Sequence, residues 1–114
     1  RQGRAVGEEG KAAARRLEER LCEAEAEGRP RQAAAHIEEA WREFLAERWQ
    51  IPAASPTPRW REILTRQGAD PETARELGEL ADDLQYLRQA PQLSAVGALQ
   101  SEALSRSRRL LRRL

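Results

Sequence analysis

One segment of the chain, residues 31–49, constrains the fold more than any other. Its apolar side chains recur at the spacing of a single face of an α-helix. This face consists of Ala33, Ile37, Ala40, Trp41, Phe44, Leu45 and Trp49. It carries two of the three tryptophans and the single phenylalanine, and aromatic side chains supply much of the burial in a small domain. The segment therefore predicts the central core helix, with Glu38, Glu39, Arg42, Glu43 and Glu47 on its solvent-exposed face.

Proline and glycine residues divide the rest of the chain into further segments with helical periodicity. We expect helices over residues 11–27, 59–66, 70–89 and 94–114, each with apolar residues at intervals of three and four. Residues 50–58 contain three prolines and predict a loop. Outside the central helix, the predicted core includes Ile63, Leu64, Leu77, Leu80, Leu84 and Leu99. The fold class that follows is all-α, a small irregular bundle of four to five helices.

The composition favours helices and excludes several other classes of protein. Ala, Leu, Glu and Arg are abundant, whereas the β-branched and aromatic residues that strands favour are scarce. A single cysteine and a single histidine exclude a disulfide framework and an ordinary zinc site. The net charge is only +1, which is not the charge imbalance of a disordered chain.

The chain is expected to consist of three parts. Residues 1–10 contain three glycines and predict a disordered segment or linker, and residues 11–27 predict an N-terminal, juxtamembrane-like helix. Residues 28–114 predict the helical domain, which ends in a basic helix. The sequence leaves open whether the first helix projects or packs on this domain. Because the sequence opens without methionine, we expect a piece of a longer protein.

The residues that could carry chemistry do not form a recognisable motif. Cys22 and His36 are the only candidates for a thiol–imidazole pair, and nothing in their spacing brings them together. Asp82 and Asp83 are adjacent, so on a helix they point in different directions and do not form a carboxylate dyad. We therefore expect no catalytic residues, no metal site, no cofactor and no small-molecule substrate.

Two sets of residues are the candidates for an interaction surface. Trp49 and Trp60 flank the proline-rich loop, where a partly exposed indole could contact a partner. The basic run consists of Arg106, Arg108, Arg109, Arg112 and Arg113. This run has three interpretations: phosphate binding in nucleic acid, contact with an anionic membrane surface, or a helix end whose arginines pair with acidic neighbours. The third is favoured, and nucleic acid is disfavoured because no aromatic residue is interleaved with the arginines.

Two stretches and a closing helix resemble a known family. The stretches are EGRPRQAAAHIEEAWREFLAERWQIP and WREILTRQGADPETARELGELADDLQYLRQAP. From about Glu25 to Leu114, their order resembles the C-terminal helical domain of BatD-type proteins of the bacterial aerotolerance (Bat) family. The family's Ala-x-Arg-aromatic phrase matches residues 46–49, whereas its Arg-aromatic-Ala-Pro phrase lacks the aromatic at Gln89. The family's Gly-Asp turn is glycine followed by Arg29 here.

The resemblance implies a context rather than a chemistry. BatD-like proteins have one membrane span, and this domain would follow it on the cytoplasmic face of the inner membrane. Their operons encode MoxR-type AAA+ ATPases and von Willebrand factor A-domain membrane proteins. The expected function is thus a non-enzymatic protein–protein interaction or scaffolding domain of a larger membrane-anchored bacterial protein. The alternatives are a nucleic-acid-binding domain that acts through the arginine run and a self-associating helical module, and the sequence does not give the oligomeric state.

Overall fold

The structure is a computed structural model that describes residues 2–27, 29–52, 54–89 and 96–113. Over these residues it contains five α-helices, and a short 3-10 turn, η1 (Thr57–Arg59), precedes the third. The helices are α1 (Gln2–Ala26), α2 (Pro30–Trp49), α3 (Trp60–Arg66), α4 (Pro71–Gln89) and α5 (Val96–Arg113). The described residues include no strand, and the predicted all-α bundle of four to five helices is confirmed.

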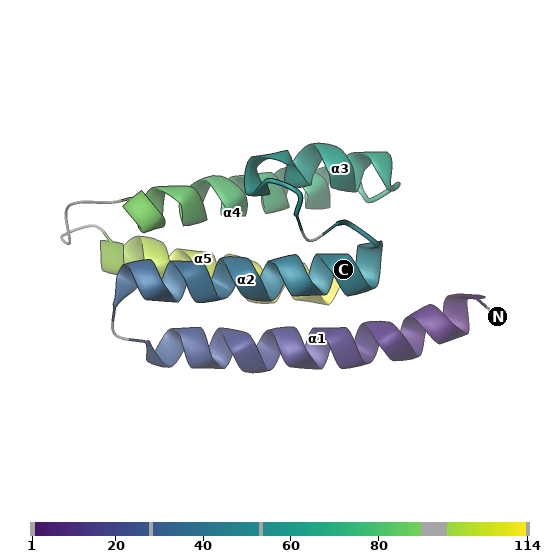
Figure 1. The fold of residues 1–114 in the computed structure, drawn as a ribbon, viewed down its shortest axis with the longest axis horizontal. Helices are drawn as coiled ribbons and strands as arrows, with labels where there is room; N and C mark the ends of the chain where they lie inside the picture. The colour runs from purple at the N-terminus through teal and green to yellow at the C-terminus, as the bar shows by residue number, and fades with distance from the viewer. Residues whose placement is uncertain (1, 28, 53, 90–95, 114) are drawn as a thin grey trace.

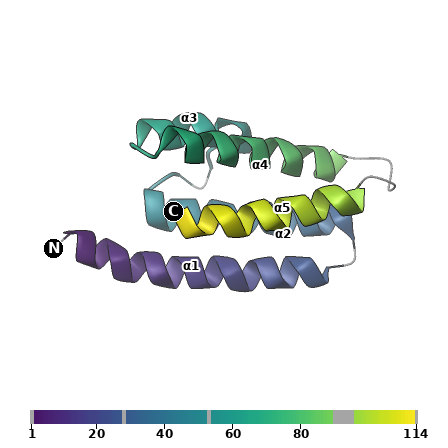
Figure 2. The same cartoon turned by 180° about the vertical axis from the view of Figure 1, so that it is seen from behind.

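The helices lie along a common long axis in three layers. Helix α1 forms one outer layer, α2 and α5 lie side by side in the middle, and α3 and α4 form the other outer layer (Figure 1). The view from behind places α5 in front of α2, between α1 and α4 (Figure 2). Helix α2 packs against α1, α4 and α5, so it is the central helix that its apolar face predicted.

Helix α1 is longer than predicted and packs on the rest of the bundle. It begins at Gln2 rather than at Lys11, so helix replaces the predicted linker from Gln2 onwards. Glycines weaken a helix, but extending an existing helix avoids the cost of nucleation, and the sequence prediction omitted this effect. Leu17 and Leu21 of α1 are fully buried, and most of the contacts of α1 are with α2. The helix therefore docks along the domain instead of projecting from it.

The core contains most of the residues predicted for it. Trp41 and Phe44 are buried with their ring centroids 5.5 Å apart in an edge-to-face arrangement. The other predicted core residues that are fully buried are Leu45, Leu64, Leu77, Leu80 and Leu84. Ile63 and Leu99 are only half-buried and pack against the margin of the core. The reason is their position, because each lies near the end of a helix where fewer neighbours cover it.

Local signals in the sequence set the beginning of α4 and the end of α3. The backbone N–H of Thr73 donates to the Oδ2 of Asp70 at 3.1 Å, which satisfies one of the free N–H groups of the first turn. Gly68 follows the end of α3 with a φ of +92°, a left-handed backbone conformation that residues with a side chain rarely adopt. From the sequence we expect Gly28 to end the first helix and Ser94 to cap the last, and both residues lie outside the described part of the chain.

Candidate functional site

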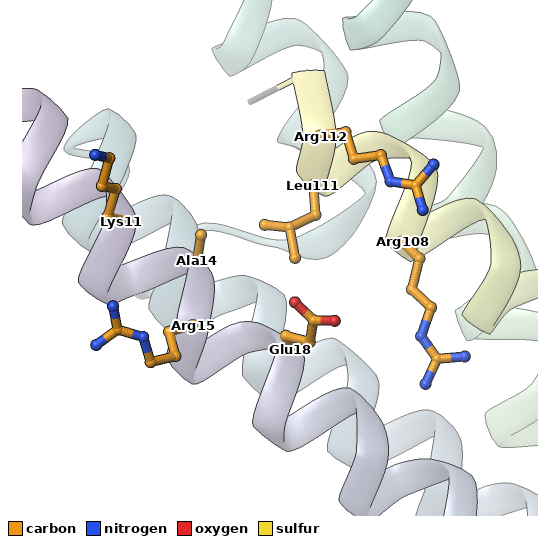
Figure 3. Close-up of a pocket in the computed structure, with 7 residues that line it drawn as sticks. All are labelled: Lys11, Ala14, Arg15, Glu18, Arg108, Leu111 and Arg112. Atoms are coloured by element: carbon orange, nitrogen blue, oxygen red, sulfur yellow. The ribbon is translucent and has the colours of Figure 1, made fainter.

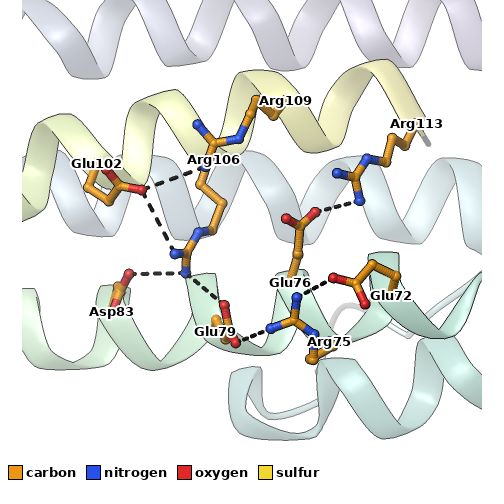
Figure 4. A network of polar contacts seen from close by, with 9 residues as sticks. All are labelled: Glu72, Arg75, Glu76, Glu79, Asp83, Glu102, Arg106, Arg109 and Arg113. Carbon is orange, nitrogen blue, oxygen red and sulfur yellow. Dashed lines mark hydrogen bonds and ion pairs between the residues drawn. The ribbon is translucent and has the colours of Figure 1, made fainter.

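The arginine run of α5 faces acidic residues of α4. The Nη1 of Arg106 lies 3.4 Å from the Oδ2 of Asp83 and 3.5 Å from the Oε1 of Glu79 (Figure 4). Two helical turns further along α5, the Nη1 of Arg113 lies 2.5 Å from the Oε1 of Glu76. Within α5, Glu102 pairs with both Arg106 and Arg109, at 3.8 and 3.6 Å. The pairs of Arg106 and Arg113 with α4 therefore join the two helices at positions seven residues apart on α5.

Arg108 extends from the other side of α5 and joins it to α1. Its Nη2 donates to the Oε1 of Glu25 at 2.8 Å and lies 4.0 Å from the Sγ of Cys22. Four of the five arginines in the run are thus paired with carboxylates of this chain. Phosphate binding depends on cations that can release counterions from the nucleic acid, and these pairs lower the positive potential of α5. The pairing favours the interpretation in which the run holds the bundle together.

The carboxyl groups of this network have pKa values displaced in opposite directions. Burial raises the pKa of Asp83, and the guanidinium of Arg106 only partly opposes this effect. The hydrogen bond from Arg108 lowers the pKa of Glu25, and the hydrogen bond from Arg75 lowers that of Glu72. The direction of each pKa shift follows from its largest cause. At the half-buried aspartate this cause is desolvation, and at the exposed glutamates it is a charge-assisted hydrogen bond.

A carboxyl titration tests these directions. We expect NMR to show Asp83 titrating above the usual range of aspartate, and Glu25 and Glu72 below that of glutamate. The depressed groups stabilise the fold at neutral pH, and this stabilisation is lost as the pH falls through their folded pKa values. The raised pKa of Asp83 has the opposite effect on stability. Its contribution becomes more favourable as the pH falls, because the folded protein binds this proton more tightly than the unfolded chain does.

The substitution Arg106→Gln provides the control for this titration. It removes the charge that lowers the pKa of Asp83, so that pKa should rise further while the pKa of Glu25 stays unchanged. An Asp83 that titrates like an exposed aspartate in both proteins would show that α4 and α5 are not packed together at this position.

An open groove runs between α1 and α5. Its volume is about 430 Å³, and its lining consists of Lys11, Ala14, Arg15, Glu18, Arg108, Leu111 and Arg112 (Figure 3). Lys11, Ala14, Arg15 and Glu18 come from α1, and the other lining residues come from α5 (Figure 3). Leu111 and Ala14 are half-buried and pack against the core, so they form an apolar floor between the charged side chains.

The cations of the groove differ from those that face α4. Lys11, Arg15 and Arg112 are exposed, and none has a carboxylate within ion-pairing distance among the residues that the structure describes. Among the lining residues whose side chains the structure describes, Glu18 is the only acidic one. The groove is therefore a concave surface on which positive charge exceeds negative charge, in a chain whose overall net charge is only +1.

A buried carboxylate that the sequence analysis placed on the surface holds the proline-rich loop. Only 5% of Glu38 is exposed. It accepts hydrogen bonds from the hydroxyl of Thr57, the amide of Gln85 at 3.2 Å and the guanidinium of Arg88 at 2.6 Å. Arg42 adds a contact to Glu38 at 3.5 Å. The expectation of a solvent-exposed Glu38 is wrong, because the loop and α4 both close over this side of α2.

Arg42 completes the attachment of the loop. Its guanidinium donates to the backbone carbonyl of Ser55 at 2.7 Å and to the hydroxyl of Thr57 at 2.9 Å. It also lies 5.7 Å from the centre of the Trp60 ring, within the range of a cation–π contact. The charges of Glu38 and Arg42 thus hold the loop against α2.

The tryptophans proposed as interaction residues have different environments. Trp60 is 1% exposed, so the expectation that it is exposed to a partner is wrong. Trp60 belongs to the core because α3 packs against α4, and the guanidinium of Arg42 lies over its ring. Trp49 is half-buried and stacks with Arg48 at 5.1 Å, and its indole N–H has no hydrogen-bond partner within the described part of the chain. A role of Trp49 in an interaction stays a prediction.

The remaining candidates for chemistry are not among the described lining residues of the groove, although Cys22 lies 4.0 Å from one of them, Arg108. Cys22 and His36 are both exposed and belong to different helices, α1 and α2. Asp82 is exposed, whereas its neighbour Asp83 faces Arg106. Over the described ranges, no group of His, Cys, Asp or Glu side chains is arranged to hold a metal ion.

Comparisons with known proteins do not identify a relative. No family model matches the chain, and neither a curated protein nor a solved structure is significantly similar to it. Within the described residues, no helix is long and apolar enough to cross a membrane. The geometry of the described residues is therefore the basis for a functional proposal.

Proposed function

We propose that this chain is a non-enzymatic protein–protein interaction or scaffolding domain. The observation that carries the proposal is the groove between α1 and α5, where Lys11, Arg15 and Arg112 surround an apolar floor. Protein interfaces combine an apolar centre with a polar rim, and the groove has both. The buried polar residues Glu38 and Ser107 hold helices together, which supports a structural rather than a chemical use.

The resemblance to BatD-type proteins suggests which partners to test. It points to a domain on the cytoplasmic face of a single-span inner-membrane protein, which works with MoxR-type AAA+ ATPases and von Willebrand A-domain proteins. The paired arginines of α5 count against the alternative of nucleic acid binding, because Arg106, Arg109 and Arg113 already face carboxylates. Contact with an anionic membrane surface would use the leucines beside the arginines of α5, and one of them, Leu110, is fully buried in the core.

Cross-linking in the source cell, followed by mass spectrometry, tests the proposal. We expect cross-links to a defined protein, and an AAA+ ATPase or an A-domain protein would support the BatD-like context. Recovery of cross-links only between copies of this chain, with a sedimentation mass above one chain, would favour the self-associating alternative. Recovery of nucleic acid that is released by salt would contradict the proposal.

A further inference from the structure

We infer that the groove between α1 and α5 binds an acidic amphipathic helix of a partner protein. In this arrangement one apolar residue of the partner covers Leu111 and Ala14, and its carboxylates contact Arg15 and Arg112. The inference rests on the proposed function and adds the chemistry of the partner segment. Helices that dock in a groove between two other helices are a common mode of peptide recognition.

The charge of the groove selects an acidic partner. Among the described lining residues, four side chains are cationic and one, Glu18, is acidic. Arg108 already donates to Glu25, which leaves Lys11, Arg15 and Arg112 as the cations that a partner can neutralise. Complementary charge of this kind accelerates association and rejects basic partners.

The spacing of the cations fits a helix. Lys11 and Arg15 are four residues apart on α1, and Arg108 and Arg112 are four residues apart on α5. Residues at this interval lie about 6 Å apart along the axis of a helix, one above the other. Glutamates four residues apart on a docked helix repeat at the same interval, so they match Lys11 and Arg15 on α1. On α5 a further carboxylate would face Arg112, because Arg108 is already paired with Glu25. This arrangement resembles the charged flanks of a coiled-coil seam, with the apolar floor between them.

The floor of the groove favours a protein segment over single-stranded nucleic acid. Bases bind to proteins largely by stacking on aromatic rings, and the lining residues that the structure describes include no aromatic side chain. Leu111 and Ala14 offer an aliphatic surface instead, which suits a leucine or isoleucine of a partner. Glu18 would repel a phosphate backbone, whereas it could pair with a lysine or arginine at one end of a partner helix.

Fluorescence anisotropy with a designed peptide tests the inference. The probe is a labelled helical peptide in which one stripe of leucines is flanked on both sides by glutamates. A scrambled isomer has the same composition and charge but no stripe. We expect the striped peptide to bind the 114-residue chain at least about tenfold more tightly than its isomer, because only the striped peptide can cover the floor.

A matched pair of variants locates the binding. The double variant Arg15→Gln/Arg112→Gln removes two groove cations and should weaken binding of the striped peptide about tenfold. The control Arg59→Gln/Arg66→Gln removes the same charge next to α3, where both arginines contact Glu62. This control lies in the outer layer opposite α1 and should change the affinity by less than about twofold (Figure 1).

Three results would overturn the inference. The first is equal binding of the striped and scrambled peptides, which would mean that charge alone attracts them. The second is equal weakening by both double variants, which would place no contact in the groove. The third is that a single-stranded oligonucleotide or anionic phosphatidylglycerol vesicles bind more tightly than the striped peptide, and that the variant Arg15→Gln/Arg112→Gln no longer binds them. If cross-linking still identifies a protein partner in any of these cases, the proposed function stands and only the assignment of the groove fails.

Discussion

Replacing Trp41 with alanine is expected to lower the free energy of unfolding by about 4 kcal/mol, because it empties a large site in the core. Trp41 is fully buried, packs edge-on against Phe44 and lies on the central helix α2. Its indole N–H also donates to the buried Oγ of Ser107 on α5, at 2.9 Å. Urea denaturation monitored by circular dichroism measures the change. We expect the m-value, the dependence of the free energy of unfolding on urea concentration, to stay constant.

Trp49 provides the control on the same helix. It is half-buried and its indole N–H has no partner in the described residues, so Trp49→Ala should cost less than half as much as Trp41→Ala. A double-mutant cycle with Trp41→Phe and Ser107→Ala isolates the hydrogen bond, for which we expect a coupling of about 1 kcal/mol. Equal losses of stability for the two tryptophan substitutions would contradict the burial of Trp41 where α2 contacts α5.

Replacing Glu38 with alanine is expected to lower the free energy of unfolding by about 2 kcal/mol, since it leaves buried hydrogen-bond donors without an acceptor. Glu38 accepts hydrogen bonds from Thr57, Gln85 and Arg88. This loss of stability is smaller than that expected for breaking a fully buried ion pair. The side chain of Arg88 is 47% exposed, so its guanidinium can donate to water when the carboxylate is removed. Urea denaturation again provides the measurement.

Glu39 is the matched control for Glu38. It is the next residue of α2, carries the same charge and is exposed. We therefore expect Glu39→Ala to change the stability by less than about 0.5 kcal/mol. Hydrogen exchange should also become faster at the amides of Ser55 and Arg59 in Glu38→Ala, because the loop loses its attachment to α2 and α4. Similar effects of the two substitutions would mean that Glu38 is a surface residue.

The parts of the fold that depend on neighbouring residues could be predicted from the sequence. Asp70 and Pro71 specify the beginning of α4 locally, and the apolar spacing of that helix placed Leu77, Leu80 and Leu84 on its buried face. The central helix could be recognised for the same reason, since its apolar face is continuous over several turns. Helical periodicity is a local signal that tertiary contacts rarely reverse.

The sites that depend on distant residues could not be predicted. Glu38 lies next to an exposed glutamate in the sequence, and only Gln85 and Arg88, far along the chain, explain its burial. Ser107 interrupts the apolar stripe of the last helix, and its purpose is apparent only from its contact with Trp41. The groove likewise requires α1 and α5 to lie side by side. The sequence analysis had identified Arg108 and Arg112 but not Lys11 or Arg15.

The arginines of α5 serve two different purposes in this account. Arg106 and Arg113 face acidic residues of α4 and hold α5 in place, whereas Arg109 pairs with Glu102 within α5 and Arg112 lines the groove. Arg108 takes part in both, since it pairs with α1 and lines the groove as well. A run of like charges in the sequence therefore does not form one binding surface, because a helix distributes it over several faces.

The most direct test of the account is an NMR titration of the ¹⁵N-labelled chain with the striped acidic peptide. The account predicts that the perturbed amides cluster on both walls of the groove, around Lys11 and Arg15 of α1 and around Leu111 and Arg112 of α5. The amides of α3, in the opposite outer layer, should remain unchanged (Figure 1). Perturbations centred on α3 and α4, or an absence of saturable perturbation at α1 and α5, would contradict it.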